Sequence, residues 1–184
     1  MNALKIPKSR MPLGVFPPGG LSFTQTANNL ARELRSDIYL TNSDKADWDN
    51  ELKSEDSVTW LPYAAVWDTG AMRTVITSKV ADELDLCVYG YQKIAGVGAI
   101  RDATEHYVDV LLPNRLNISS VAVLKGGLPG DVDVLIGMDI ICMGDFAVTN
   151  VGGRTVLSFR YPSLRTIDFV KEGFPGKDAH GEPK

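Results

Sequence analysis

The stretch VWDTGAMRTVI, residues 66–76, places an acidic residue at the end of an apolar run. Asp68 is followed by Thr69 and Gly70, and a β-branched alternation then resumes. Because an isolated ionised carboxylate is costly to remove from water, an aspartate at the end of a buried strand needs partners or a chemical role. Asp and Gly also favour ordinary turns, so the stretch alone leaves a simple strand-ending turn open.

Short runs rich in β-branched and aromatic residues surround this stretch, and turn residues such as Pro and Gly separate them. Such runs are typical of strands. Apolar residues at helical spacing favour short helices in SKVADELDL, residues 78–86, and in MDIICMG, residues 138–144, where Asp139 is a candidate cap. We therefore predict an all-β domain over residues 57–163, with strands in VTWLPYAAVW, TVITS, HYVDVLL, ISSVAVLK, VDVLIG, FAVTN and TVLSFRY.

The two ends of the chain differ from this domain in composition. Residues 1–56 begin with a stretch rich in Pro and Gly and end in a densely charged one, which predicts an N-terminal arm and a solvated loop. Between them TQTANNLARELRS, residues 24–36, has apolar residues at helical spacing and predicts a short amphipathic helix. Residues 164–184 are rich in polar residues, Gly and Pro, which predicts a flexible tail.

The charge balance and the cysteines limit the classes of partner. The formal net charge is −4 and the pI is about 5.2, which argues against nucleic acid and against an anionic membrane as partners. Cys87 and Cys142 lie in apolar segments, which favours buried free thiols in an intracellular protein over the alternative of a single disulfide between them. The N-terminal stretch does not read as a secretory signal and no run is long enough to span a membrane, so a cytoplasmic location is expected.

Two more segments, which follow Asp68 along the chain, have patterns that could complete a binding cleft around it. KIAGVGAIRDATEHYVDV, residues 93–110, has two strand-like arms around a Gly-containing tip and predicts a hairpin able to cover a cleft. GVGAIR within it lacks the third Gly of a dinucleotide-binding loop, and no βαβ unit is evident, so a dinucleotide site is not favoured. DVLIGMDII, residues 133–141, combines apolar residues, Gly137 and a short apolar helix.

In these three ordered motifs the chain resembles the retropepsin family of aspartic proteases, the single-domain kind found in retroviruses and retroelements. It is also similar to the related domain of the eukaryotic DNA-damage-inducible ubiquitin-receptor proteins. Residues 68–71 match the catalytic loop, residues 96–100 match the flap, and LIGMDII, residues 135–141, matches the apolar-apolar-Gly motif with its helix. The resemblance covers residues 58 to about 160 and implies an all-β, retropepsin-like acid protease barrel with one or two short helices.

The resemblance implies an aspartic endopeptidase that needs no cofactor. Two carboxylates share one proton, because two like charges so close together cannot both ionise cheaply. Since the chain has one Asp-Thr-Gly, the pair would come from a homodimer with one Asp68 per subunit. Water activated by this pair would attack a peptide bond of a polypeptide bound in extended conformation. His106 and His180 have no second ligand at metal spacing, so no metal is expected.

The resemblance also implies roles for the residues around Asp68. Thr69 would hydrogen-bond across the dimer axis, Gly70 would let the backbone approach the substrate, and Ala71 would flank the peptide. Gly137 would pack beneath the catalytic loop, where the chain crosses itself. The flap would close over the substrate and pair with its backbone, through the candidate residues Gly96, Val97, Gly98, Ala99 and Ile100.

Other features depart from the family or leave another function open. Retroviral members commonly carry an acid and an Arg that form an ion pair where this chain has Met72 and Met138, so a dimer would be stabilised differently. The alternative function is a catalytically silent module for dimerisation or peptide binding. A further alternative is that residues 1–55 act as a propeptide. Apolar residues near the cleft predict a preference for apolar substrate side chains, namely Val97, Ile100 and Val134.

Overall fold

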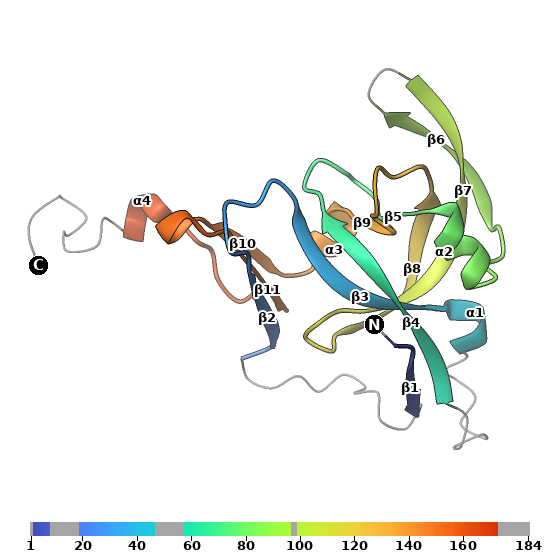
Figure 1. The fold of residues 1–184 in the computed structure, drawn as a ribbon, viewed down its shortest axis with the longest axis horizontal. Coiled ribbons are helices and arrows are strands. Elements are labelled where there is room, and N and C mark those ends of the chain that lie inside the picture. The colour runs from blue at the N-terminus through green and yellow to red at the C-terminus, as the bar shows by residue number, and fades with distance from the viewer. Residues whose placement is uncertain (1, 8–18, 47–56, 97–98, 173–184) are drawn as a thin grey trace, which may run out of the picture.

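The computed structural model describes residues 2–7, 19–46, 57–96 and 99–172 (Figure 1). Strands dominate these residues and the helices among them are short, so the predicted all-β class is confirmed. The strands are β1 (Leu4–Pro7), β2 (Leu21–Thr26), β3 (Leu34–Asn42), β4 (Ser57–Trp67), β5 (Val75–Ile76), β6 (Gly90–Gly96), β7 (Ala99–Leu111), β8 (Asn117–Lys125), β9 (Val134–Ile136), β10 (Asp145–Thr149) and β11 (Val156–Tyr161). The helices are α1 (Ser43–Ala46), α2 (Ser78–Glu83), α3 (Met138–Ile141) and α4 (Phe169–Glu172), with a 3-10 turn η2 (Val151–Gly153).

The strands form a large sheet that closes on itself and a smaller sheet beside it. The large sheet has eight strands in the order β1-β4-β3-β7-β8-β5-β9, with β6 paired to β7. An additional parallel pairing joins β9, the last strand of this run, to β4, the second strand, so the sheet closes into a barrel with β1 outside the closed ring. The smaller sheet has the order β10-β11-β2, and the β6–β7 hairpin projects from the barrel at the upper right of Figure 1.

Trp67, the residue before Asp68, ties the barrel to the smaller sheet. Its buried ring stacks on Phe146 of β10 with the ring centroids 5.6 Å apart, and lies 5.2 Å from the ring of Phe159 of β11. Its indole N–H donates a hydrogen bond of 2.9 Å to the Ser36 hydroxyl of β3. Aromatic burial and a satisfied indole N–H both stabilise this position. These contacts of Trp67 therefore hold the backbone directly before Asp68 in one position.

The predicted amphipathic helix over residues 24–36 is wrong. Residues 21–26 form β2, which pairs with β11, and residues 34–42 form β3, which lies between β4 and β7 in the barrel. Pairing with distant strands stabilises an extended conformation more than the helical spacing of a few Ala and Leu residues stabilises a helix. The domain boundary near residue 57 stays a prediction, although β3 and β4, on either side of it, belong to one sheet.

The two short helices predicted after Asp68 are present. α2 is capped by Thr77, whose hydroxyl accepts a hydrogen bond of 3.4 Å from the Val80 N–H. α3 follows Gly137, so Asp139 lies in its first turn and is not its cap, which corrects that prediction. In the described ranges no helix is both long and apolar enough to cross a membrane.

Cys87 and Cys142 are free, but both are exposed, so the prediction that they are buried is wrong. Cys142 directly follows α3, which buries Ile140 and Ile141. Because successive helical positions point in different directions, the residue after this buried pair faces outward. The apolar residues next to each cysteine in the sequence therefore did not predict whether its thiol is buried.

Asp145 at the start of β10 anchors the segment after β11. Its carboxylate accepts hydrogen bonds from the Ser163 hydroxyl at 2.6 Å and from the Leu164 N–H at 3.0 Å, and it pairs with Arg160. These three partners, in that order of importance, hold the pKa of the Asp145 carboxyl well below its usual value. The bonds therefore favour the ionised form in the folded protein.

We expect Asp145→Asn to be less stable than the wild type at pH 6 by about 1 kcal/mol, as for a partly exposed ion pair. Because the folded pKa is depressed, the contribution is present above the unfolded value of about 3.9 and is lost as the pH falls towards the folded value. Urea unfolding at pH 6, 4 and 2.5 should show that the difference in stability between the wild type and Asp145→Asn becomes smaller as the pH falls. A difference that stays constant over this range would contradict the assignment.

Candidate active site

Asp68 lies where β4 passes into a tight turn. Its N–H donates a hydrogen bond of 2.9 Å to the Ile136 carbonyl, so the pairing of β4 with β9 continues to the aspartate itself. Its Oδ1 accepts a hydrogen bond of 2.8 Å from the Gly70 N–H, and its carbonyl accepts one of 3.2 Å from the Ala71 N–H. The carboxylate is partly exposed, while Thr69 and Gly70 are exposed. One carboxylate oxygen is thus held by the loop, next to an exposed turn.

Gly137 lies against the backbone that follows Asp68. A side chain built on Gly137 would place its Cβ 2.6 Å from the Arg73 carbonyl carbon and 3.0 Å from the Ala71 carbonyl oxygen. The same oxygen accepts a hydrogen bond of 2.8 Å from the Met138 N–H. Only a residue without a side chain fits this crossing without a shift of the backbone. The segments 68–74 and 136–139 therefore hold each other in place.

Thr74 and Asp139 fasten the same crossing, a role that the sequence indicated for neither residue. The Asp139 carboxylate accepts two hydrogen bonds of 2.8 Å, one from the Thr74 N–H and one from its hydroxyl. The fully buried Thr74 hydroxyl in turn accepts a bond of 3.2 Å from the Gly137 N–H. The sequence signal for this pair is weak, because a polar residue beside each motif does not show that the two residues meet in the folded chain.

Arg73 connects this crossing to the base of the hairpin. Its guanidinium donates a hydrogen bond of 3.0 Å to the Ala122 carbonyl of β8 and lies 3.3 Å from the Glu105 carboxylate of β7. It also lies 3.9 Å from Asp139. Since β7 is one strand of the projecting hairpin, Arg73 links the loop after Asp68 to the element that was predicted to cover the cleft.

We expect Asp139→Ala to lower the free energy of unfolding by about 3 kcal/mol, because it removes a charged acceptor and leaves buried donors of Thr74 unpaired. Urea unfolding at pH 7 measures the change. Asp82→Ala on the exposed face of α2 is the matched control, and it should stay within about 0.5 kcal/mol of the wild type. Equal stability of the two variants would show that the Asp139 bonds contribute nothing.

The predicted flap residues lie at the end of the β6–β7 hairpin. The pairing runs from Gly90 opposite Glu105 to Gly96 opposite Ala99, which confirms a hairpin in this part of the sequence. Ile100 lies opposite Ala95, one step from the tip. The candidates at positions 97 and 98, Val and Gly, lie outside the described residues. The hairpin is thus present, and its closing over a substrate stays a prediction.

Met72 and Met138, which replace the ion pair common in retroviral members, lie in different environments. Met72 is 83% exposed, whereas Met138 packs against the buried core of the barrel. Thr69 in the loop of Asp68 is exposed as well. The loop that carries Asp68 therefore presents an apolar side chain and a hydroxyl to solvent in the single chain, with no buried charge left unpaired at these two positions.

No family model matches this chain, and no curated protein does either. Among solved structures, a retropepsin-like aspartic protease from Rickettsia conorii is 11% identical with a TM-score of 0.47, and the match covers 76% of this chain and 95% of that one. EIAV protease in complex with an inhibitor is 20% identical with a TM-score of 0.45, over 63% of this chain and 91% of that one. The retroviral protease-like domain of Ddi1 from Leishmania major is 15% identical with a TM-score of 0.34, over 60% and 78%.

The three structures are described as proteases or as a protease-like domain, and their TM-scores all lie below 0.5. Identities between 11% and 20% say nothing about catalysis. The function is therefore inferred from the residues of this chain.

Proposed function

We propose that this chain is an aspartic endopeptidase of the retropepsin type, active as a homodimer with one Asp68 from each subunit. The observation that carries the proposal is the loop of residues 68–71. It ends a buried strand in a partly exposed carboxylate, one oxygen of which is held by the Gly70 N–H, and Gly137 crosses beneath it. A loop fastened in this way can hold a carboxylate in one position against a second copy of itself.

A second subunit is needed because the chemistry requires two carboxylates. Two aspartates brought together share one proton, since both cannot ionise cheaply at close range. The sequence has one Asp-Thr-Gly, so a twofold axis beside Asp68 is the simplest source of the second. The exposed Thr69 and Met72 next to it are available for contact with a partner, and Thr69 would hydrogen-bond across the axis.

In this proposal the ionised Asp68 takes a proton from a water molecule as the oxygen attacks the carbonyl carbon of the scissile peptide. The protonated Asp68 of the other subunit donates its proton to the carbonyl oxygen, which gives a neutral gem-diol. The C–N bond then breaks as the nitrogen receives the proton of the pair, and one hydroxyl of the gem-diol gives its proton back to the pair as the carboxyl product forms, so the pair ends with one shared proton as it began. No cofactor or metal takes part.

The remaining parts of the site follow from the same proposal. Ala71 flanks the bound peptide and Gly70 leaves room for its backbone. The hairpin tip, residues 96–100, closes over an extended polypeptide and pairs with it like an added strand. Residues 57–163 form the protease domain, together with β2 and β3 from the residues before it. The predicted tail, residues 164–184, lies outside the described residues from position 173 onward, and the protein acts in the cytoplasm without nucleic acid or membrane partners.

Mixing two versions of the protein tests the dimer. We expect that adding an equal amount of Asp68→Asn protein to a fixed amount of wild type, with time for subunits to exchange, about halves the cleavage of casein, because half of the active subunits then face an inactive partner. Adding Asp82→Asn protein, which keeps its own Asp68, should instead raise the rate. Unchanged cleavage with Asp68→Asn would contradict a shared site.

The alternative of a catalytically silent module gives a different result. Wild-type protein that sediments as a dimer, binds unfolded polypeptide and cleaves none between pH 3 and 8 would support that alternative and contradict the endopeptidase.

A further inference from the structure

The barrel face that carries Asp68 also carries residues of β3 and β9. In the register of the sheet, Arg35 lies opposite Val66, and Val66 lies beside Leu135. Side chains alternate along a strand, and paired residues point to the same face. Because β4 still pairs with β9 at Asp68, its carboxylate lies on the face of Val66, whereas Trp67 between them is buried.

The next row of the same face lies further from Asp68 along the strands. Asp37 lies opposite Ala64 in the β3–β4 pairing. On the other side of Ala64, the Asp133 N–H donates a hydrogen bond of 2.9 Å to the Ala64 carbonyl. The Asp133 carboxylate accepts one of 3.2 Å from the Ala64 N–H and lies 3.0 Å from the Lys79 ammonium. An apolar strip of Ala64, Val66 and Leu135 thus runs between charged side chains.

Val134 does not belong to this strip. It was predicted to lie near the cleft, but it is buried in the core, and that prediction is wrong. Its neighbour Leu135 points the other way, as alternation along β9 requires, and is partly exposed beside Val66.

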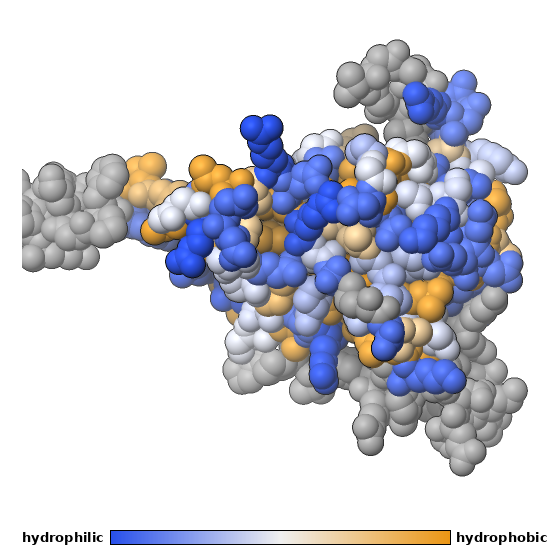
Figure 2. Space-filling model, viewed as in Figure 1, coloured by the Kyte–Doolittle hydropathy of each residue, from blue (hydrophilic) through white to orange (hydrophobic). Residues whose placement is uncertain are grey.

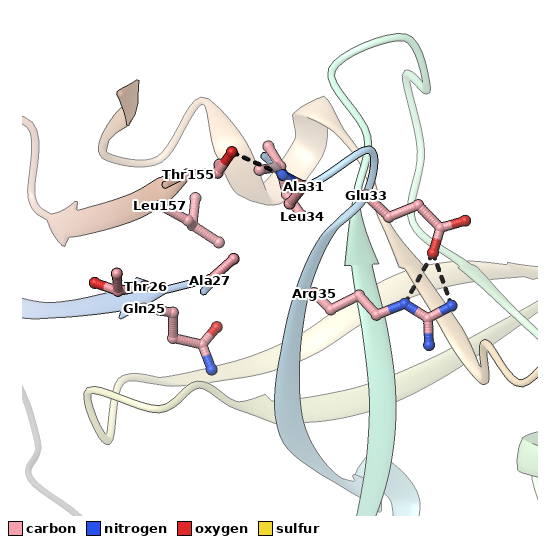
Figure 3. A pocket seen from close by; sticks show the side chains of 9 residues that line it. All are labelled: Gln25, Thr26, Ala27, Ala31, Glu33, Leu34, Arg35, Thr155 and Leu157. Atoms are coloured by element: carbon pink, nitrogen blue, oxygen red, sulfur yellow. Dashed lines mark hydrogen bonds and ion pairs between the residues drawn. The ribbon is translucent and has the colours of Figure 1, made fainter. Parts of the chain in front are cut away.

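A charged cluster borders the strip at the end nearest Asp68. The Arg35 guanidinium lies 2.7 Å from the Glu33 carboxylate and 2.8 Å from the Asp131 carboxylate, and so ties β3 to the loop before β9. Figure 3 shows the Glu33 and Arg35 side chains lying together over the strands. We call Glu33, Asp37, Asp131 and Asp133 the acidic rim. Arg35 pairs with Glu33 and Asp131, and Lys79 pairs with Asp133, so the four carboxylates outnumber these two cations and the rim keeps a net negative charge.

Space for a side chain is present beside this rim. A cavity of about 300 Å³ is lined by Glu33 and Arg35 together with Leu34, Ala27 and Leu157 and with polar residues of β2 and Thr155 (Figure 3). In the space-filling view, hydrophilic residues cover much of the front of the barrel around smaller hydrophobic areas (Figure 2). The strip of Ala64, Val66 and Leu135 offers apolar surface for an aliphatic stem, and the acidic rim offers carboxylates for a cationic end.

We infer that this face selects substrates with a lysine or arginine side chain close to the scissile bond. The aliphatic stem would lie on Val66 and Leu135, and the cationic end would reach the acidic rim. Arg35 lowers the pKa of the Asp131 carboxyl through their hydrogen bond, so this part of the rim stays ionised under mildly acidic conditions. The inference rests on the proposed endopeptidase function, because it takes Asp68 as the centre of the cleft.

Matched peptides test the inference. Cleavage sites are first mapped by mass spectrometry in an unfolded protein, and one site is then synthesised with lysine, norleucine or glutamate at each of the three positions on either side of the cut. Norleucine keeps the stem and removes the charge. We expect lysine to raise kcat/KM about fivefold over norleucine at one or more positions, as for an exposed charge pair, and glutamate to lower it. Added salt at 0.5 M should reduce the preference.

The double variant Glu33→Gln/Asp131→Asn should lose most of the preference for lysine while it still cleaves the norleucine peptide. Asp82→Asn, on α2, is the control for the loss of a carboxylate elsewhere and should keep the preference. Equal cleavage of lysine and norleucine peptides by the wild type, or an unchanged preference in the double variant, would overturn the inference.

A second measurement separates this inference from the proposed function. If the wild type cleaves no protein, the endopeptidase fails, and fluorescence anisotropy with labelled lysine and norleucine peptides then tests the rim alone. Tighter binding of the lysine peptide that disappears in Glu33→Gln/Asp131→Asn would support the rim as a peptide-binding surface. Equal binding, or none, would overturn it.

Discussion

Asp68→Asn should cleave casein at least about a thousandfold more slowly than the wild type, because the homodimer would lose both its general base and its general acid. Asparagine has nearly the same shape and can still accept the hydrogen bond from the Gly70 N–H, so the loop should keep its conformation. The measurement is the release of peptides over the range from pH 3 to 8, at a protein concentration where sedimentation shows a dimer.

Two controls make this result specific to the chemistry. Asp82→Asn removes a carboxylate from the exposed face of α2 and should retain wild-type activity. Asp68→Asn itself should keep the circular dichroism spectrum and the dimer of the wild type. Cleavage by Asp68→Asn at the wild-type rate would show that the aspartate serves the fold, and the proposed mechanism would then be wrong.

Gly137→Ala should lower the free energy of unfolding by about 3 kcal/mol, at the upper end of what an overpacked position costs. The new methyl group would lie 2.6 Å from the Arg73 carbonyl carbon and 2.7 Å from its oxygen, and both are backbone atoms that no side-chain rotation can move. The segments on either side of the crossing would have to separate. That shift would displace Asp68, so activity should fall even at temperatures where the variant is folded.

Gly127→Ala is the matched control, since nothing in the described structure lies within 4 Å of the Cβ that it would add. Urea unfolding compares the stability of the two variants, and casein cleavage compares their activity. Wild-type stability in Gly137→Ala would mean that the backbone of the crossing moves apart at little cost, and Gly137 would then not be needed to hold the loop.

The motifs that were recognisable in the sequence are those whose residues are neighbours in the chain. Asp68, Thr69 and Gly70 form a turn through bonds between residues two and three apart, so the sequence alone contains the whole unit. α2 was predicted for the same reason, since its cap and its buried face lie within one short segment. The hairpin of β6 and β7 also depends on residues close together in sequence.

The predictions that were wrong concern features that depend on residues far apart in the sequence. Residues 24–36 carry a helical spacing of apolar residues, but β2 pairs with β11 more than a hundred residues further on, and β3 pairs with β4 and β7. Local spacing contains no information about which distant strand is available, and pairing with a sheet outweighs a weak local preference. The outward position of the thiols follows likewise from where the helices pack.

The sequence by itself determined the all-β class and the turn that carries Asp68, because both follow from local pattern, whereas the second subunit stays a prediction that rests on the single Asp-Thr-Gly. Only the tertiary structure decided how that turn is held and what surrounds it. Thr74 meets Asp139 across 65 positions of sequence, and Arg35 meets Asp131 across 96. Such pairs become visible only when closure of the barrel brings β4, β3 and β9 side by side, because hydrogen bonds and ion pairs act over a few ångströms of space, whatever the distance along the chain.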